Sequence, residues 1–220
     1  MDVIDFAAGL HGKTRRDYLQ RVTDHDKAAC AEVAIEFGPD YWDGDRRYGY
    51  GGMQYDGRWR PVAEAMVEHY GLTSQSKILD VGCGKGFLLY EFTQVCPGVD
   101  VTGLDISKYA IEKAKPEVRS AIVEGAATHL PWEDESFDLV ISLMTLHNLK
   151  NWELHKALQE MERVSRGGKY FTVESYRTEQ EKVNLLYWQL TCRAFHTPEE
   201  WMWLCEQAGY TGDVGFLFFE

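Results

Sequence analysis

The sequence has 220 residues, of which 45% are hydrophobic and 26% charged, so the chain can bury one sizeable core and is not dominated by disorder. Its formal net charge is −12, which disfavours DNA or RNA as a partner, because phosphate backbones bind to basic surfaces. Two basic clusters stand out, one at residues 13–16 and the other formed by Arg46 and Arg47 with Arg58 and Arg60.

No apolar run approaches the ~20 residues that a membrane-spanning helix requires. The first ten residues contain two aspartates and lack the basic start and apolar centre of a signal peptide. The five cysteines are scattered, without the spacing of a metal site. We therefore expect a cytoplasmic protein with reduced thiols, no membrane span and no bound metal.

The first 60 residues differ in composition from the rest and are predicted to form an extension of the main domain. A helical pattern runs over residues 14–37 and is ended by Gly38 and Pro39. Residues 40–60 follow with six aromatic side chains among several glycines. This stretch is too glycine-rich for a helix and too aromatic for a plain linker.

Residues 61–220 alternate between helical patterns and short apolar strands, which predicts the main domain. Helices are expected at 61–70, 87–95, 107–115, 151–164, 179–190 and 198–208. Strands are expected at 77–81, 99–104, 118–123, 137–143, 169–174 and 216–219. Such alternation forms parallel βαβ units. The predicted fold is an α/β, Rossmann-like three-layer sandwich with a mostly parallel central sheet and an N-terminal helical and aromatic lid.

A glycine-rich loop, Asp80–Gly86, lies between the first predicted strand of this domain and the helix that follows. Glycine allows the loop to turn tightly and to approach a ligand without a clashing Cβ. The next helix offers its N-terminal amides and dipole to an anionic group. Asp105 closes the second strand, where a carboxylate can accept hydrogen bonds from both hydroxyls of a ribose. Together these features predict a cofactor that contains a nucleoside.

Four segments in order resemble the motifs of class I S-adenosylmethionine-dependent methyltransferases, in particular the ubiquinone/menaquinone-type (methyltransferase type 11/25-like) subgroup. Residues 78–86 are similar to the first motif and residues 103–107 to the second. Residues 125–132, with the apolar strand after Ser136, resemble the third motif and fourth strand. Residues 162–168 are similar to the junction before the fifth strand. The resemblance is close over about residues 77–174.

The resemblance implies that S-adenosylmethionine is the cofactor and assigns roles to particular residues. Gly82, Cys83 and Gly84 would line the methionine and ribose portion, Asp105 would hold the ribose, and Asp80 would orient the loop or reach the methionine ammonium through water. Ile106 would pack on the adenine, Ala126 and Ala127 would edge it, and Leu143 would line the site after the fourth strand. The subgroup usually has an acid where this chain has Ala126, so we expect a backbone carbonyl to bind the adenine amino group instead. Glu124 should point elsewhere.

Methyl acceptors in such folds are expected beyond the carboxyl ends of the strands. His147 follows the fourth strand and is a candidate base near neutral pH, or else a locally packed side chain. Glu174 and Tyr176 follow the fifth strand and are further catalytic candidates, with Arg177 available for a carboxylate or phosphate. The alternative for these three is a solvated strand end.

The aromatic segment is predicted to act as a lid over the cofactor, because aromatic faces can shield a sulfonium from water. Tyr48 and Tyr50 flank its densest glycines and are the candidates for its inner face, and Arg58 is a candidate for the donor's carboxylate. The alternative is a rigid loop packed against the helix over residues 61–70.

The predicted function is methyl transfer from S-adenosylmethionine to a small polar metabolite, by in-line displacement, with no nucleic-acid partner. A nicotinamide-dependent oxidoreductase is one alternative, although its G-x-G-x-x-G pattern is replaced here by G-x-G-x-G. A propylamine transferase or a non-catalytic S-adenosylmethionine-binding module on the same fold is another.

Overall fold

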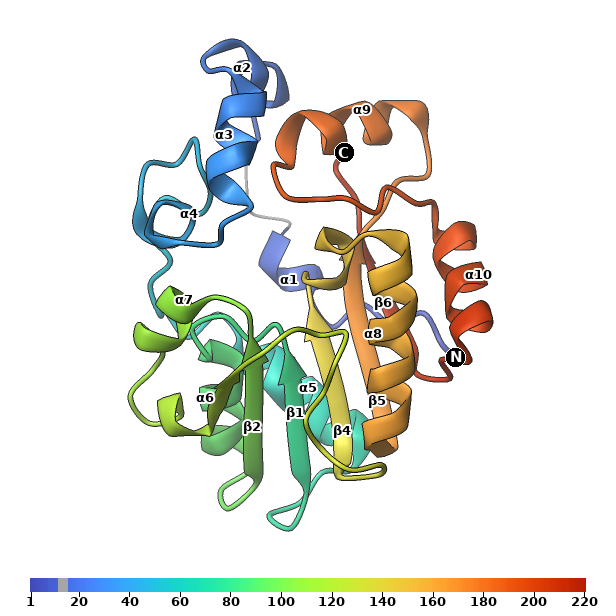
Figure 1. Cartoon of the computed structure of the whole chain (residues 1–220). Helices are drawn as coiled ribbons and strands as arrows, with labels where there is room; N and C mark the ends of the chain where they lie inside the picture. Colours follow the sequence, from blue (N-terminus) through green and yellow to red (C-terminus); the bar gives the residue numbers. More distant parts are fainter. Residues whose placement is uncertain (12–15) are drawn as a thin grey trace.

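The computed structural model describes residues 1–11 and 16–220, and its centre is a sheet of six parallel strands in the order β3-β2-β1-β4-β5-β6 (Figure 1). The strands are β1 (Lys77–Val81), β2 (Asp100–Asp105), β3 (Ile122–Glu124), β4 (Phe137–Leu143), β5 (Ser165–Glu174) and β6 (Asp213–Leu217). The expected α/β, Rossmann-like sandwich is confirmed, and all of its strands are parallel. The central strands β1 and β4 are buried almost throughout, as in sheets that are covered on both faces.

Helices form the two outer layers of the sandwich. On one face, α5 (Arg60–Tyr70) and α6 (Phe87–Val95) pack against the sheet in an apolar cluster around Met66 and Phe92. On the other face, α8 (Asn151–Val164) and α10 (Pro198–Ala208) form a second cluster around Leu158 and Trp201. The short α7 (Lys108–Glu112) follows β2, and its N-cap Ser107 accepts a hydrogen bond from the amide of Ala110.

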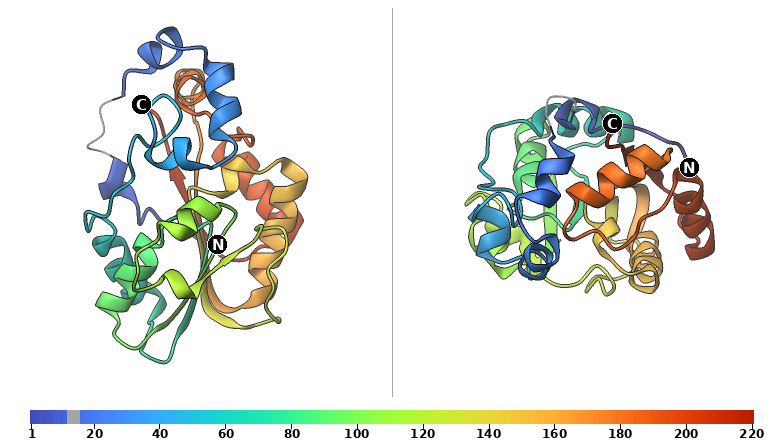
Figure 2. Two further views of the ribbon diagram at one scale, coloured as in Figure 1. Left: turned by 60° about the vertical axis from the view of Figure 1, so that its left-hand side comes forward. Right: turned by 90° about the horizontal axis from the view of Figure 1, so that it is seen from above.

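The remaining helices gather above the carboxyl ends of the strands (Figures 1 and 2). They are α2 (Tyr18–Thr23), α3 (Lys27–Ala34), α4 (Pro39–Asp43) and α9 (Glu179–Trp188), and α2 packs against α9. At the N-terminus, Val3 forms a parallel bridge with Val214 of β6. The short α1 (Ala8–His11) follows and lies nearer the sheet (Figure 1). This arrangement covers the end of the sheet at which open α/β folds bind their ligands.

The N-terminal region differs from the single helix expected over residues 14–37. Residues 14 and 15 lie outside the described residues, and the rest forms α2 and α3 with a break at residues 24–26. Asp26 causes the break, because its side chain accepts hydrogen bonds from the amides of Ala28 and Ala29 and so caps a new helix. We also expected no helix in the aromatic segment, and this was wrong, because α4 begins at Pro39 and ends at Asp43.

Several element boundaries shift by a few residues. The strand expected over residues 118–123 is a 3-10 turn, Arg119–Ala121, followed by the short β3. The last strand, β6, begins earlier than expected and ends at Leu217, and α7 and α9 end earlier. No helix of the described residues is long and apolar enough to cross a membrane.

Candidate functional site

Two adjoining cavities open at the carboxyl ends of the strands. The inner cavity has a volume of about 240 Å³ and is formed by the glycine-rich loop and the ends of β2 and β4. The outer cavity has a volume of about 470 Å³ and is formed by the N-terminal helices, the segment after α4 and the chain around α9. The residues that line both cavities are Tyr41, Tyr50, Met53, Trp59, Phe87 and Met144. A ligand in one cavity can therefore meet a ligand in the other.

The inner cavity gathers most of the residues that the sequence predicted for the cofactor. Its lining includes Asp80, Gly82, Cys83, Gly84, Asp105, Ile106, Ala126, Ala127, Leu143 and Tyr50. The register explains this convergence, because Asp80 pairs with Gly103 of β2 and with Ile141 of β4, so the three strands end side by side. Ile106 is 62% exposed, which leaves its side chain available to an adenine ring.

Asp105 holds the glycine-rich loop in place as well as facing the cavity. Its Oδ2 accepts a hydrogen bond of 2.6 Å from the Gly84 amide, and its Oδ1 accepts one of 2.8 Å from the Ser107 amide. Burial raises the pKa of Asp105, and these amides oppose the rise. A carboxylate offers about four lone-pair sites, so it retains acceptor capacity for the two hydroxyls of a ribose.

Asp80 is the second buried acid of the inner cavity. It is 4% exposed, and burial together with the neighbouring Asp105 raises its pKa to about 8. Its carboxyl group takes part in no hydrogen bond with the described residues. An acid without a partner on a cavity wall suits a ligand with a positively charged group, and the ammonium of S-adenosylmethionine is such a group. The donor and acceptor set of the cavity therefore fits this cofactor.

The glycines of the loop are required by packing within the protein. Gly82 and Gly84 both have positive φ angles, of 82° and 54°. A Cβ on Gly82 would lie 2.2 Å from the Thr145 hydroxyl oxygen, and a Cβ on Gly84 would lie 2.7 Å from the indole ring of Trp42. The expected close approach of ligand to loop is thus accompanied by a close approach of Trp42, which also lines the inner cavity.

The aromatic segment is fastened to the glycine-rich loop by buried polar contacts. Lys85 is 4% exposed, and its Nζ lies 2.7 Å from both carboxylate oxygens of Asp43 and donates to the Met53 carbonyl at 2.9 Å. The indole of Trp42 donates to the Ser107 hydroxyl at 2.9 Å. The Tyr109 hydroxyl donates to Asp43 at 2.9 Å. These contacts join the aromatic segment to the glycine-rich loop, and Trp59 at its end also packs in the apolar cluster of α5.

The residues predicted for the lid have different surroundings. Tyr50 stacks on Trp42, with ring centroids 5.4 Å apart, and lines both cavities. Tyr48 lines neither cavity and instead lies against the guanidinium of Arg47. Arg58 lines the outer cavity, where it forms an ion pair of 2.6 Å with Asp56. The structure therefore does not support Tyr48 at the inner face, and it places Arg58 away from the cofactor loop.

Ala126 lines the part of the inner cavity where the family resemblance would place the adenine. Glu124 points away from the cavity and lies 3.6 Å from Lys108, as expected. Thr128, Asn148 and Glu153 contribute polar groups to the lining. Of these, Glu153 already accepts a hydrogen bond from the Lys150 amide at the start of α8.

The end of β4 shapes the boundary between the two cavities. Met144 follows this strand with a φ angle of 53°, which is unusual for a residue other than glycine and is found most often at functional sites. Its amide donates to the Thr172 carbonyl at 2.8 Å, which holds the bend in place. The bend directs the chain from β4 into the turn that carries His147.

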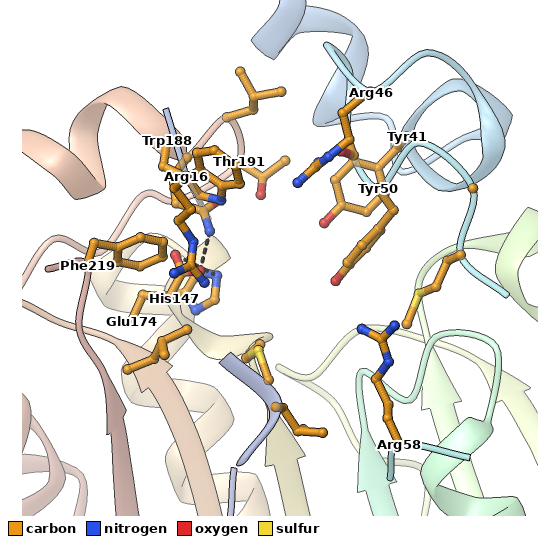
Figure 3. A pocket seen from close by; sticks show the side chains of 18 of the residues that line it. Arg16, Tyr41, Arg46, Tyr50, Arg58, His147, Glu174, Trp188, Thr191 and Phe219 are labelled. Carbon is orange, nitrogen blue, oxygen red and sulfur yellow. Dashed lines mark hydrogen bonds and ion pairs between the residues drawn. The ribbon is translucent and has the colours of Figure 1, made fainter. Parts of the chain in front are cut away.

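His147 and Glu174 form a buried pair on the wall of the outer cavity (Figure 3). The His147 Nε2 lies 3.6 Å from the Glu174 Oε2, and both side chains are almost fully buried. Burial lowers the pKa of His147 to about 3 and raises the pKa of Glu174 to about 8. Both groups are therefore uncharged at neutral pH. We expected His147 to be a base with a pKa near neutrality, but its burial lowers the pKa far below that range.

The third catalytic candidate lies outside the cavities. Tyr176 is buried in a small apolar cluster with Leu185 and Phe219, and it lines neither cavity. Its ring faces the Lys182 ammonium at 5.1 Å. Arg177 pairs with Glu181 and Glu220 and is not presented to a ligand. Proximity to the end of β5 was a poor guide here, because the chain turns away from the cavity directly after Glu174.

Comparison with known families matches residues 79–173 to the methyltransferase domain family. A demethylmenaquinone methyltransferase of Roseiflexus castenholzii is 31% identical over 60% of this chain, which spans 56% of that protein. An uncharacterized methyltransferase of Synechocystis is 31% identical over 66% of this chain and 71% of its own length. A tRNA (carboxymethyluridine(34)-5-O)-methyltransferase of Arabidopsis thaliana is 32% identical over 66% of this chain and 34% of its own length.

A solved structure shares the fold. The crystal structure of the YcgJ protein from Bacillus subtilis superposes with a TM-score of 0.54 at 21% identity, covering 66% of each chain. With the sheet order, the glycine-rich loop and Asp105, these similarities define a class I, Rossmann-like methyltransferase domain, of the kind that uses S-adenosylmethionine. The chain belongs to the methyltransferase domain family.

Sequence reasoning missed the residues that depend on distant partners. Lys85 lies within the predicted loop, but its pairing with Asp43 joins residues 42 positions apart. Trp42 was seen only as one aromatic residue among six. The basic residues Arg16 and Arg46 belong to the two clusters visible in the sequence, and the fold brings both into the outer cavity.

Proposed function

We propose that this methyltransferase acts on a small polar metabolite that binds in the outer cavity. The main support is that Tyr50 and Met144 line both cavities, so an acceptor in the outer cavity would lie next to a methyl donor in the inner one. A volume of about 470 Å³ is in the range of small-molecule sites. The outer cavity is also lined by arginines, an acid and a histidine, which favours a polar ligand.

In this proposal S-adenosylmethionine supplies the methyl group, and the protein supplies position and exclusion of water. Asp105 would hold the ribose, and Asp80 would face the ammonium. Tyr50 and Trp42 cover the loop from above. The uncharged His147 can accept a hydrogen bond from the acceptor, which would orient the nucleophile toward the inner cavity. Above its pKa of about 8, Glu174 can take up a proton that the acceptor releases.

The relatives leave two other acceptor classes to be tested, a quinone and a tRNA. The activities of these two relatives belong to proteins of which this chain covers 56% and 34%. The net charge of −12 argues against an RNA acceptor, and the charged groups of the outer cavity argue against an apolar one.

The test uses the purified chain with methyl-labelled S-adenosylmethionine and three acceptor preparations: an aqueous metabolite extract, a quinone extract and bulk tRNA. Label should enter the aqueous fraction, and Asp105→Asn should reduce the incorporation in the same fraction. Label that enters only the quinone or the tRNA would overturn the proposed acceptor class, while methyl transfer itself would stand.

A further inference from the structure

Positive charge gathers around a single indole ring on the wall of the outer cavity. The guanidinium carbons of Arg46, Arg21 and Arg16 lie 5.2, 5.5 and 5.6 Å from the Trp188 ring centroid. These three residues, here called the arginine cluster, all line the outer cavity. Figure 3 shows Arg16 and Arg46 entering it from different sides. The fold thus assembles a cationic site from separate parts of a chain whose net charge is −12.

The arginine cluster has no carboxylate partner within ion-pair distance among residues 1–11 and 16–220. Arg21 donates to the carbonyls of Arg46 at 2.8 Å and of Trp188 at 3.4 Å, and Arg46 donates to the Gly49 carbonyl. The buried Nε of Arg16 has no hydrogen-bond partner in the same residues. Carbonyl oxygens orient these side chains but do not neutralise their charge.

The two acids of the described residues that line the outer cavity are Asp56, which pairs with Arg58, and Glu174. Glu174 lines the same cavity and feels the charge of Arg16, but burial still raises its pKa to about 8. The cationic groups also repel one another: burial and Arg46 lower the pKa of Arg21, and burial and Arg16 lower that of Arg46. Like charges held together without a counterion destabilise the fold, so their presence calls for a ligand that restores the balance.

Guanidinium groups are suited to carboxylate and phosphate oxygens, which they bind through paired, charge-assisted hydrogen bonds. We propose that the arginine cluster binds an oxyanion group, a carboxylate or a phosphate, carried by the methyl acceptor. The identification of this ligand as the acceptor rests on the proposed function of the outer cavity.

The position of the cluster gives the bound molecule a direction. The three arginines line the outer cavity only, whereas Tyr50 and Met144 line both cavities. An acceptor anchored by its oxyanion beside Trp188 therefore extends its other end toward the inner cavity. The arginine cluster acts in this way as a specificity determinant, and it rejects acceptors that lack an anionic group because its charge would then stay unpaired.

The experiment measures binding of inorganic phosphate and of malonate to the purified full chain by calorimetry, without S-adenosylmethionine. Sodium chloride at the same ionic strength is the reference for general screening. Wild type should bind at least one of the two anions saturably. Arg46→Gln and Arg16→Gln should each weaken that binding at least about tenfold, the effect of one lost charge-assisted hydrogen bond. Circular dichroism confirms that both variants are folded.

Arg47→Gln is the matched control, because Arg47 adjoins Arg46 in the chain but lies against Tyr48 and outside the cavity. It should bind the anion within about twofold of wild type. Saturable binding of phosphate alone identifies a phosphorylated acceptor, and binding of malonate identifies a carboxylate. The proposal is overturned if neither anion binds above the chloride reference, or if Arg47→Gln loses as much affinity as Arg46→Gln.

Binding of S-adenosylhomocysteine to the same preparations separates this inference from the proposed function. If the nucleoside binds and both anions fail, the arginine cluster is not an oxyanion site, but methyl transfer stands. If an anion binds and the nucleoside fails, the proposed function is lost, but the oxyanion site remains.

Discussion

Replacing Glu174 with glutamine should change how the stability of the protein depends on pH. The substitution keeps the shape of the side chain but removes its titration. Burial raises the pKa of Glu174 to about 8, whereas a glutamate in the unfolded chain titrates near ~4.3. Between these values the unfolded state releases its proton and the folded state retains it. The folded state then binds more protons, so Glu174 lowers the free energy of unfolding as pH rises through this window.

The magnitude follows from the size of the shift. Each pH unit between about 5 and 7.5 should cost wild type up to ~1.4 kcal/mol relative to Glu174→Gln, with a ceiling of about 5 kcal/mol above pH 8. The Glu174 side chain is only 5% exposed, so solvent screening reduces this value little. Some reduction is expected from relaxation around His147, and a few kcal/mol is the expected total.

Urea denaturation followed by circular dichroism at four pH values from 5 to 8, at constant ionic strength, measures the effect. The control is Glu32→Gln, which removes an exposed carboxyl from α3 and accounts for the loss of one charge. The difference between Glu174→Gln and wild type should grow steadily with pH. If the two stability curves run parallel, Glu174 is ionised in the folded state, and the assignment of an uncharged pair with His147 is wrong.

Three other changes test the inner cavity and its cover. Asp105→Asn should weaken S-adenosylhomocysteine binding by at least about 1.4 kcal/mol, or tenfold, because hydrogen bonds to a charged group are stronger than those to a neutral one. The exposed Asp100→Asn is the control and should leave the affinity unchanged. Equal affinities of Asp105→Asn and wild type would place the ribose elsewhere. Gly84→Val should abolish binding in a folded protein, because its Cβ would lie 2.7 Å from the Trp42 indole at a positive φ; retained binding would contradict this. Amides over residues 49–57 should exchange more slowly once the nucleoside is bound, and equal protection with and without it would reject the lid.

The strands and helices of the sheet region could be predicted because their signals are local. The run from Phe137 to Leu143 is almost entirely apolar, which suits a strand buried on both faces, and its bounds agree with β4. The helix expected over residues 198–208 agrees with α10, which starts at a capping box formed by Thr197 and Glu200. The glycine-rich loop and Asp105 could be placed at one site because parallel strands end at the same edge of a sheet.

The features that sequence reasoning missed depend on tertiary contacts or on competing local signals. The apolar pattern over residues 14–37 hid the capping preference of Asp26, which divides the region into two helices. Nothing in the order of residues shows that Lys85 meets Asp43, or that Arg16 and Arg46 share one indole. For Tyr176, distance along the chain from β5 could not reveal the turn that buries it away from the cavity.

Calorimetric titration of the purified chain with S-adenosylhomocysteine tests the central claim most directly, with NADH as the competing nucleotide. We predict saturable binding in the micromolar range at one site per chain, a rise in melting temperature with the same ligand, and no binding of NADH. The inner cavity, with Asp80 and Asp105 at its wall, is the site that should fill. Absence of heat and of any thermal shift at saturating S-adenosylhomocysteine, or saturable binding of NADH instead, would contradict it.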